Sequence, residues 1–137
     1  MTEEVKRNYL EISSLKDLNE GIKPSKDYSL DLIDPINFQL NKFFYKNIGK
    51  KHKWIDRLIW SDVNWINYVS STNVKTYILR HRNDLVGFFE LIFHREKKEI
   101  ELAYLGILEE YQNKNLGSYL LSQAIKESLD KKNIKRV

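Results

Sequence analysis

The spacing of apolar residues along the 137-residue chain predicts a succession of strands and helices. The strand-like segments are residues 8–12, 28–34, 74–82, 85–95, 99–108 and 134–137. The segments with apolar residues at helical spacing are residues 36–49, 61–71 and 116–131. Segments 85–95 and 99–108 are apolar on both faces, which is typical of central strands that are covered on both sides.

Turn and cap residues set the limits of these segments. Pro35 follows a strand, and Gly49 predicts the end of the first helix. Ser61 and Asp62 are candidate N-caps of the second helix. Residues 96–98 turn the chain between the two central strands, so we expect those strands to form a hairpin.

The order of the elements predicts one α/β domain that spans residues 1–137. Two helices precede three strands, and a strand–helix–strand unit closes the chain. A long antiparallel hairpin followed by such a crossover indicates a mixed, mostly antiparallel central sheet that is flanked by helices on both faces.

Composition narrows the class of protein. Apolar residues make up 42% of the chain and charged residues 31%, which is typical of a soluble globular protein. No apolar run reaches the ~18 residues of a membrane span, and the first residues lack a signal-peptide pattern, so we expect no membrane partner. The chain has no cysteine, which excludes disulfides and zinc–thiolate sites and makes the cytoplasm the default location.

The charge balance does not by itself indicate a nucleic-acid partner. The net charge is +4, but the lysines are scattered and the densest cluster, "KNIGKKHK" (46–53), is short. A solvated basic face is therefore favoured over a phosphate-binding patch, and we expect no nucleic-acid partner. The three histidines lack the spacing of metal ligands, so we also expect no metal.

The stretch "YQNKNLGSYLL" (111–121) is the candidate for chemistry because it places a polar loop directly before an amphipathic helix. The first N–H groups of a helix are unpaired and carry a partial positive charge. A loop that bends its own N–H groups toward the same point can hold phosphate oxygens. Gly117 permits close approach of the backbone, and Lys114 adds a charge at the rim. The alternative interpretation is an ordinary polar loop.

Residues 105–121, "LGILEEYQNKNLGSYLL", resemble the acetyl-coenzyme A signature of the GNAT superfamily of N-acetyltransferases. That signature has an apolar strand end, then Gln or Arg, two residues, Gly, one residue, and Gly or Ala. Gln112, Asn115 and Gly117 fall on these positions. Asn115 departs from the usual Gly, although Asn adopts positive φ more readily than other side chains. The stretches "YLEISSLKDL", "WIDRLIWSDVNWINYV", "VGFFEL" and "EIELAYLGIL" look like one bacterial branch of the superfamily, so the resemblance covers about residues 9–137.

The resemblance implies transfer of an acetyl group from acetyl-CoA to a primary amine of a small molecule or a protein. Free backbone groups near Leu105–Leu108 would pair with the pantetheine arm, and an N–H near Ile107 would polarise the thioester carbonyl. The N–H groups of residues 112–118 would hold the pyrophosphate. The implied cofactor-binding residues are Leu105, Gly106, Ile107, Leu108, Gln112, Asn113, Lys114, Asn115, Leu116, Gly117 and Ser118.

Two acids lie in otherwise apolar strands and are the candidate catalytic residues, Glu90 and Glu101. A carboxylate can take the proton that an amine must lose before it attacks the thioester. Glu101 lies on a position where well-known family members carry their general base. A tight hairpin turn without a bulge would pair Glu90 with Tyr104 and Glu101 with Phe93, which places the two acids on opposite faces of the sheet. A bulge near Gly106 would change that phase.

The sequence ends at Val137, in the first residues of a predicted strand. Family members continue for about 40 residues, including a Tyr that protonates the departing thiolate. We therefore expect a C-terminally incomplete domain whose catalysis alone is weak, and whose sheet edge could recruit a second copy as a homodimer. Two alternatives stay open: a catalytically degenerate CoA-binding or interaction module and, less favoured, a nucleic-acid binder.

Overall fold

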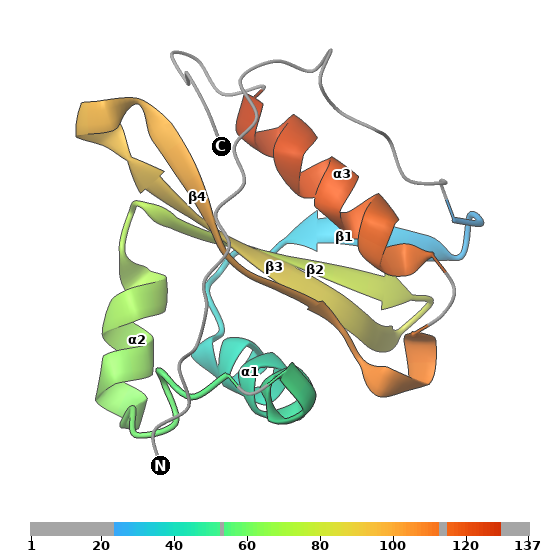
Figure 1. Cartoon of the computed structure of the whole chain (residues 1–137), viewed down its shortest axis with the longest axis horizontal. Helices are drawn as coiled ribbons and strands as arrows, with labels where there is room; N and C mark the ends of the chain where they lie inside the picture. The colour runs from blue at the N-terminus through green and yellow to red at the C-terminus, as the bar shows by residue number, and fades with distance from the viewer. Residues whose placement is uncertain (1–23, 53, 113–114, 130–137) are drawn as a thin grey trace.

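The computed structural model describes residues 24–52, 54–112 and 115–129, with only the backbone of residues 51 and 52. These residues form a four-stranded antiparallel sheet and three helices (Figure 1). The strands are β1 (Tyr28–Leu32), β2 (Val74–His81), β3 (Asp84–His94) and β4 (Glu99–Ile107). The helices are α1 (Phe38–His52), α2 (Asp62–Ser70) and α3 (Leu116–Leu129). The strands predicted at residues 8–12 and 134–137 lie outside the described residues.

The helices cover both faces of the sheet, as the sequence predicts. On one face, Phe44 and Ile48 of α1 pack against Ile78 and Phe88 of the central strands. On the other face, α3 packs its buried side against a second cluster that includes Tyr77, Leu79, Phe89 and Leu91. Figure 1 shows α1 and α2 below the sheet and α3 above it. The sheet is therefore the middle layer of a three-layer α+β fold.

The second helix begins at its predicted cap. The Ser61 hydroxyl accepts a hydrogen bond from the Asn64 N–H, and the Asn64 side chain accepts one from the Ser61 N–H, which completes a capping box. Trp65 and Val69 then turn inward and are buried.

The sequence predicted that the first helix ends at Gly49, but α1 continues to His52. A side chain at position 49 would meet Trp54, since a Cβ built there lies 2.8 Å from the Trp54 Cβ. Because Gly49 has no side chain, Trp54 can pack directly against α1 at this position. The Trp54 N–H donates to the Gly49 carbonyl oxygen at 2.9 Å, which fixes that return.

A bulge in the β3–β4 hairpin overturns the predicted register of Glu101. Glu90 pairs with Tyr104 as expected, but Leu91 pairs with Leu102, so Ala103 is the extra residue. Glu101 consequently faces Ile92 instead of Phe93. The bulge shifts the phase of β4 and brings Glu101 and Glu90 to the same face of the sheet, the face that α1 covers. The opposite faces expected for a hairpin without a bulge are therefore wrong, and the alternative of a phase change by a bulge holds, with the bulge at Ala103.

Candidate functional site

β4 is the last strand of the described sheet, so one of its edges has no neighbouring strand among the described residues. On the side of β4 that faces β3, the Leu108 N–H donates to the carbonyl oxygen of Val86 at 2.8 Å. Because successive residues of a strand direct their N–H groups to opposite sides, the Ile107 N–H points toward the outer edge. The Ile107 carbonyl oxygen accepts a hydrogen bond from the Gln112 side-chain amide at 3.2 Å.

The residues predicted to bind the pantetheine arm contribute their backbone at this edge. Ile107 and Leu108 are buried, and Leu105 is half-buried against the α3 side of the core. Gly106 faces the opposite layer, where a Cβ would lie 2.5 Å from Ile48. Because the Leu108 N–H bonds to the β3 side and N–H direction alternates along a strand, the backbone groups of Leu105 and Ile107 are the ones in this stretch that can meet a ligand along the edge.

The loop after β4 enters α3 through Asn115, which has φ 60°. The predicted positive φ at Asn115 is confirmed, and it turns the chain so that α3 begins at Leu116. Leu116 is buried and anchors the first turn to the core. Apart from the chain neighbours and the backbone of α3 itself, no heavy atom of the described residues lies within 4 Å of a Cβ built at Gly117, which leaves space beside the first turn. The first-turn N–H groups, Leu116 to Ser118, have no acceptor within the helix itself. Asn113 and Lys114 lie outside the described residues.

Glu101 is the accessible acid of the predicted pair. Its side chain is 52% exposed, and its Oε1 lies 2.9 Å from Nε2 of His94, the last residue of β3. Since both side chains are exposed, this ion pair adds little to the stability of the fold. The Glu101 carboxylate is therefore accessible from solvent at the surface of β4 while it contacts His94.

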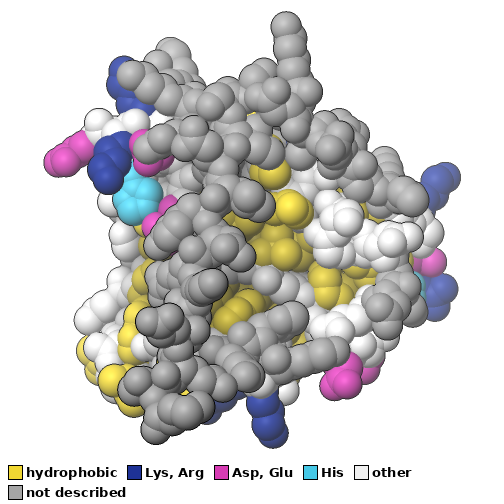
Figure 2. Space-filling view, in the orientation of Figure 1, with side chains coloured by type: hydrophobic (Ala, Val, Ile, Leu, Met, Phe, Trp, Pro, Cys, Tyr) yellow, Lys and Arg dark blue, Asp and Glu magenta, His cyan; other side chains and the backbone are white. Residues whose placement is uncertain are grey.

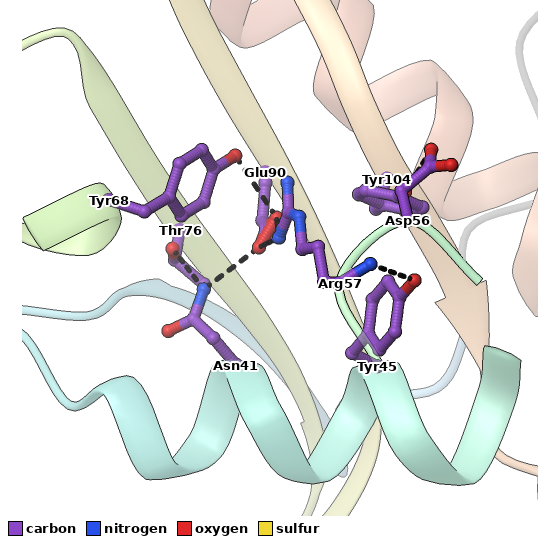
Figure 3. A network of polar contacts seen from close by, with 8 residues as sticks. All are labelled: Asn41, Tyr45, Asp56, Arg57, Tyr68, Thr76, Glu90 and Tyr104. Atoms are coloured by element: carbon purple, nitrogen blue, oxygen red, sulfur yellow. Dashed lines mark hydrogen bonds and ion pairs between the residues drawn. The ribbon is translucent and has the colours of Figure 1, made fainter. Parts of the chain in front are cut away.

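Glu90 is fully buried, and Figure 3 shows it at the centre of a polar network. Arg57 Nη1 donates to both carboxylate oxygens of Glu90, at 2.9 Å and 2.8 Å. The Asn41 side-chain amide donates to Oε1 at 3.1 Å, and the Tyr68 hydroxyl donates to Oε2 at 3.2 Å. This closed environment differs from the acceptor cleft that was predicted for Glu90, and it favours a structural role.

Arg57, which the sequence analysis did not single out, is held within a cage of aromatic rings. Its guanidinium carbon lies 4.1 Å from the Tyr68 ring centroid, 4.4 Å from Tyr104 and 4.8 Å from Trp60. Burial alone would lower the pKa of Arg57, but the Glu90 charge raises it above the usual value. Burial first, and then the Glu90 charge, raise the pKa of Tyr68. The aromatic density of "WIDRLIW" was the one available signal for this cage.

The segment that carries Arg57 also brings Asp56 to β4. The Tyr104 hydroxyl donates to Asp56 Oδ2 at 3.3 Å, and Figure 3 shows the Asp56 carboxylate beside the Tyr104 ring. Burial, followed by the neighbouring Tyr45 and Asp56, raises the pKa of Tyr104, so its hydroxyl remains a neutral donor. A hydroxyl and two carboxylates, those of Asp56 and Glu101, thus share the α1-facing side of β4.

Across 24–52, 54–112 and 115–129, no group of three His, Cys, Asp or Glu side chains could hold a metal ion. No helix in that part of the chain combines the length and apolar character needed to cross a membrane. Figure 2 shows the visible charged side chains at the margin of one face and hydrophobic side chains toward its middle.

The comparisons with known proteins decide the family. The model of the acetyltransferase (GNAT) family matches residues 37–137. The chain belongs to the GNAT family. None of the curated proteins is a significant match in sequence.

Several solved structures share the GNAT fold of this chain. An aminoglycoside acetyltransferase from an uncultured soil metagenomic sample superimposes with a TM-score of 0.59 at 8% identity, over 74% of this chain and 69% of that chain. The ribosomal-protein-S18-alanine N-acetyltransferase of Escherichia coli superimposes with a TM-score of 0.57 at 15% identity, over 74% of this chain and 59% of that chain. The aminoglycoside 6'-N-acetyltransferase of Enterococcus faecium superimposes with a TM-score of 0.52 at 20% identity, over 73% of this chain and 54% of that chain. At these identities the likeness shows the fold alone.

Proposed function

We propose that the chain transfers an acetyl group from acetyl-CoA to a primary amine of a small molecule or a protein. GNAT membership supports acetyl transfer in general. The observation that carries the proposal is the join between β4 and α3. There, an outward Ile107 N–H, a positive φ at Asn115 and an open first helical turn follow one another along the chain.

The residues at this join fit the donor in type and placement. Within residues 105–108, the outward backbone groups of Leu105 and Ile107 would pair with an extended pantetheine arm as an added strand would. The Ile107 N–H would polarise a thioester carbonyl, and the first-turn N–H groups of α3 would receive phosphate oxygens. The Gln112 amide, which bonds the Ile107 carbonyl, would release it when the arm pairs there.

Glu101 is the acid that we assign to proton removal. It would accept a proton from the acceptor ammonium, directly or through a water, so that the neutral amine attacks the carbonyl carbon. The C–S bond would then break, and the CoA thiolate would leave and take up the second amine proton. Glu90 is a poor candidate for this step because its two oxygens already accept hydrogen bonds from Arg57, Asn41 and Tyr68.

Calorimetry with CoA and a coupled assay of thiol release with a panel of primary amines test the proposal. We expect saturable CoA binding, and Asn115→Ala should weaken it because Ala tolerates φ 60° less well than Asn. Asn115→Gly is the matched variant that keeps binding. We expect Glu101→Gln to lower kcat about a hundredfold or more while CoA still binds. Absence of CoA binding by the folded chain would refute the proposal.

A second candidate is a CoA-binding module without catalysis. The closed ion pair of Glu90 favours it, because only one of the two predicted acids is then accessible. The same experiments separate the two: this module would bind CoA with no acetyl transfer to any amine, and Glu101→Gln would change nothing.

A further inference from the structure

A cavity of about 210 Å³ lies on the α1–α2 side of the molecule, away from β4. It opens where β1 ends, α1 begins, α2 ends and β2 begins, and none of its described lining residues comes from β3 or β4. Leu32, Ile36, Val69 and Val74 form its apolar wall. The cavity is therefore separate from the proposed CoA site.

Asn41 places a hydrogen-bond acceptor in this wall. Its residue is only 1% exposed, and its amide nitrogen donates to Thr76 Oγ1 at 2.8 Å and to Glu90 Oε1 at 3.1 Å. A carboxylate bound to Arg57 can only accept, so the nitrogen must be the atom that faces Glu90. The orientation of the Asn41 amide is thereby fixed by chemistry.

The Asn41 side-chain oxygen consequently points the other way, as Figure 3 shows. Among the described residues it has no hydrogen-bond donor, although the residue is almost fully buried. No side-chain nitrogen or oxygen in the described part of the chain is both sealed from solvent and unpaired, so this oxygen must open into the cavity. Water in the cavity can donate to this oxygen, and a ligand that donates to it would replace that water without leaving the acceptor unpaired.

The rest of the wall defines the ligand further. Leu32 and Ile36 leave 42% and 51% of their surface exposed at the mouth, so both offer apolar surface to a ligand. A cavity of about 150 Å³ lined by such residues can hold a benzene ring. The lining also carries one charge of each sign, the carboxylate of Asp34 and the ammonium of Lys75, so charge alone does not select between an amine and a neutral hydroxyl group.

We propose that this cavity binds a small molecule with an apolar body and a primary amine or hydroxyl group that donates to Asn41 Oδ1. The donor occupies the polar end, and the apolar body replaces water along Leu32, Ile36, Val69 and Val74. The site requires neither CoA nor acetyl transfer.

Titrations of the full chain with benzylamine, benzyl alcohol and toluene, followed by backbone amide NMR shifts, test the proposal. We expect saturable shifts confined to residues 32–41 and 69–76 for the amine and the alcohol. We expect toluene, which has the same ring but no donor, to bind about fivefold more weakly, since a buried hydrogen bond contributes about 1 kcal/mol. Tighter binding of benzylamine than of benzyl alcohol would assign the ammonium, and the reverse would assign the hydroxyl.

Two variants of α2 make the test independent of the Glu90 network. Ser70 lines the cavity and is exposed, so Ser70→Phe should fill the mouth and abolish binding while the protein stays folded. Val63→Phe adds the same ring to the same helix at a residue outside the cavity lining and should leave binding unchanged. Equal affinity for toluene and benzylamine, unchanged binding in Ser70→Phe, or no saturable shift at millimolar probe would overturn the proposal.

Discussion

Two glutamates of similar sequence context occupy opposite environments. Glu90 and Glu101 both interrupt apolar strands and share one face of the sheet, yet Glu90 is fully buried and Glu101 is about half exposed. The difference comes from Arg57, which lies 33 residues before Glu90 in a connecting segment and closes over it. A buried ion pair contributes little net stability when intact, but removing one partner leaves an uncompensated charge.

The environments predict different costs for the same substitution. Glu90→Gln leaves the Arg57 guanidinium buried beside a neutral amide, and we expect the free energy of unfolding to fall by about 3–5 kcal/mol. Glu101→Gln removes only an exposed pair with His94 and should change it by less than about 1 kcal/mol. Urea unfolding of both variants measures these values. Equal losses in the two variants would mean that Glu90 is not held as described.

Most element positions follow from the sequence because they rest on local signals. The 3.6-residue spacing located all three helices, and the Ser61 cap located the start of α2. The bulge at Ala103 left no comparable signal, because "ELAYLG" is apolar on both faces and permits either phase. The Arg57–Glu90 contact also could not be predicted from the sequence, since pairing between distant residues depends on how the layers pack.

Two glycines test how closely the elements are packed. A Cβ at Gly106 of β4 would lie 2.5 Å from Ile48 of α1, whereas one at Gly117 of α3 meets nothing within 4 Å. We expect Gly106→Ala to lower the free energy of unfolding by about 1–3 kcal/mol through overpacking. Gly117→Ala should leave it unchanged or raise it by up to about 1 kcal/mol, because Ala favours helix.

The same glycine pair separates packing from binding. Gly117 stands beside the proposed pyrophosphate site, so a methyl group there should weaken CoA binding in a protein of undiminished stability. Thermal unfolding with and without CoA reports both effects in one experiment. A destabilised Gly117→Ala variant, or one that binds CoA as tightly as the parent chain, would contradict the open geometry of the first turn.

At the scale of the whole molecule, the sheet separates two kinds of interior. The α1 side contains the charged network around Glu90, whereas the cluster on the α3 side is built from apolar and aromatic side chains. Tyr77 of β2 links α3 to the sheet. Its ring stacks on Phe89 of β3, and its hydroxyl donates to Glu127 of α3 at 3.4 Å. The attachment of α3 therefore includes a titratable group.

The titration of Tyr77 predicts how stability responds to alkaline pH. Burial, reinforced by the Glu127 charge, raises the pKa of Tyr77 from 10.0 to about 12. The folded chain thus keeps this proton at a pH where the unfolded chain releases it, so the contribution to stability is complete below pH 10 and is lost as the pH rises toward 12. Urea unfolding across this range should show a falling free energy of unfolding. The total fall should be smaller by about 1–2 kcal/mol in Tyr77→Phe than in the parent chain. Glu127→Gln removes the charge but keeps the ring, and it should narrow the pH window without abolishing the fall. An identical pH dependence in the parent chain and Tyr77→Phe would show that α3 is not attached through this hydroxyl.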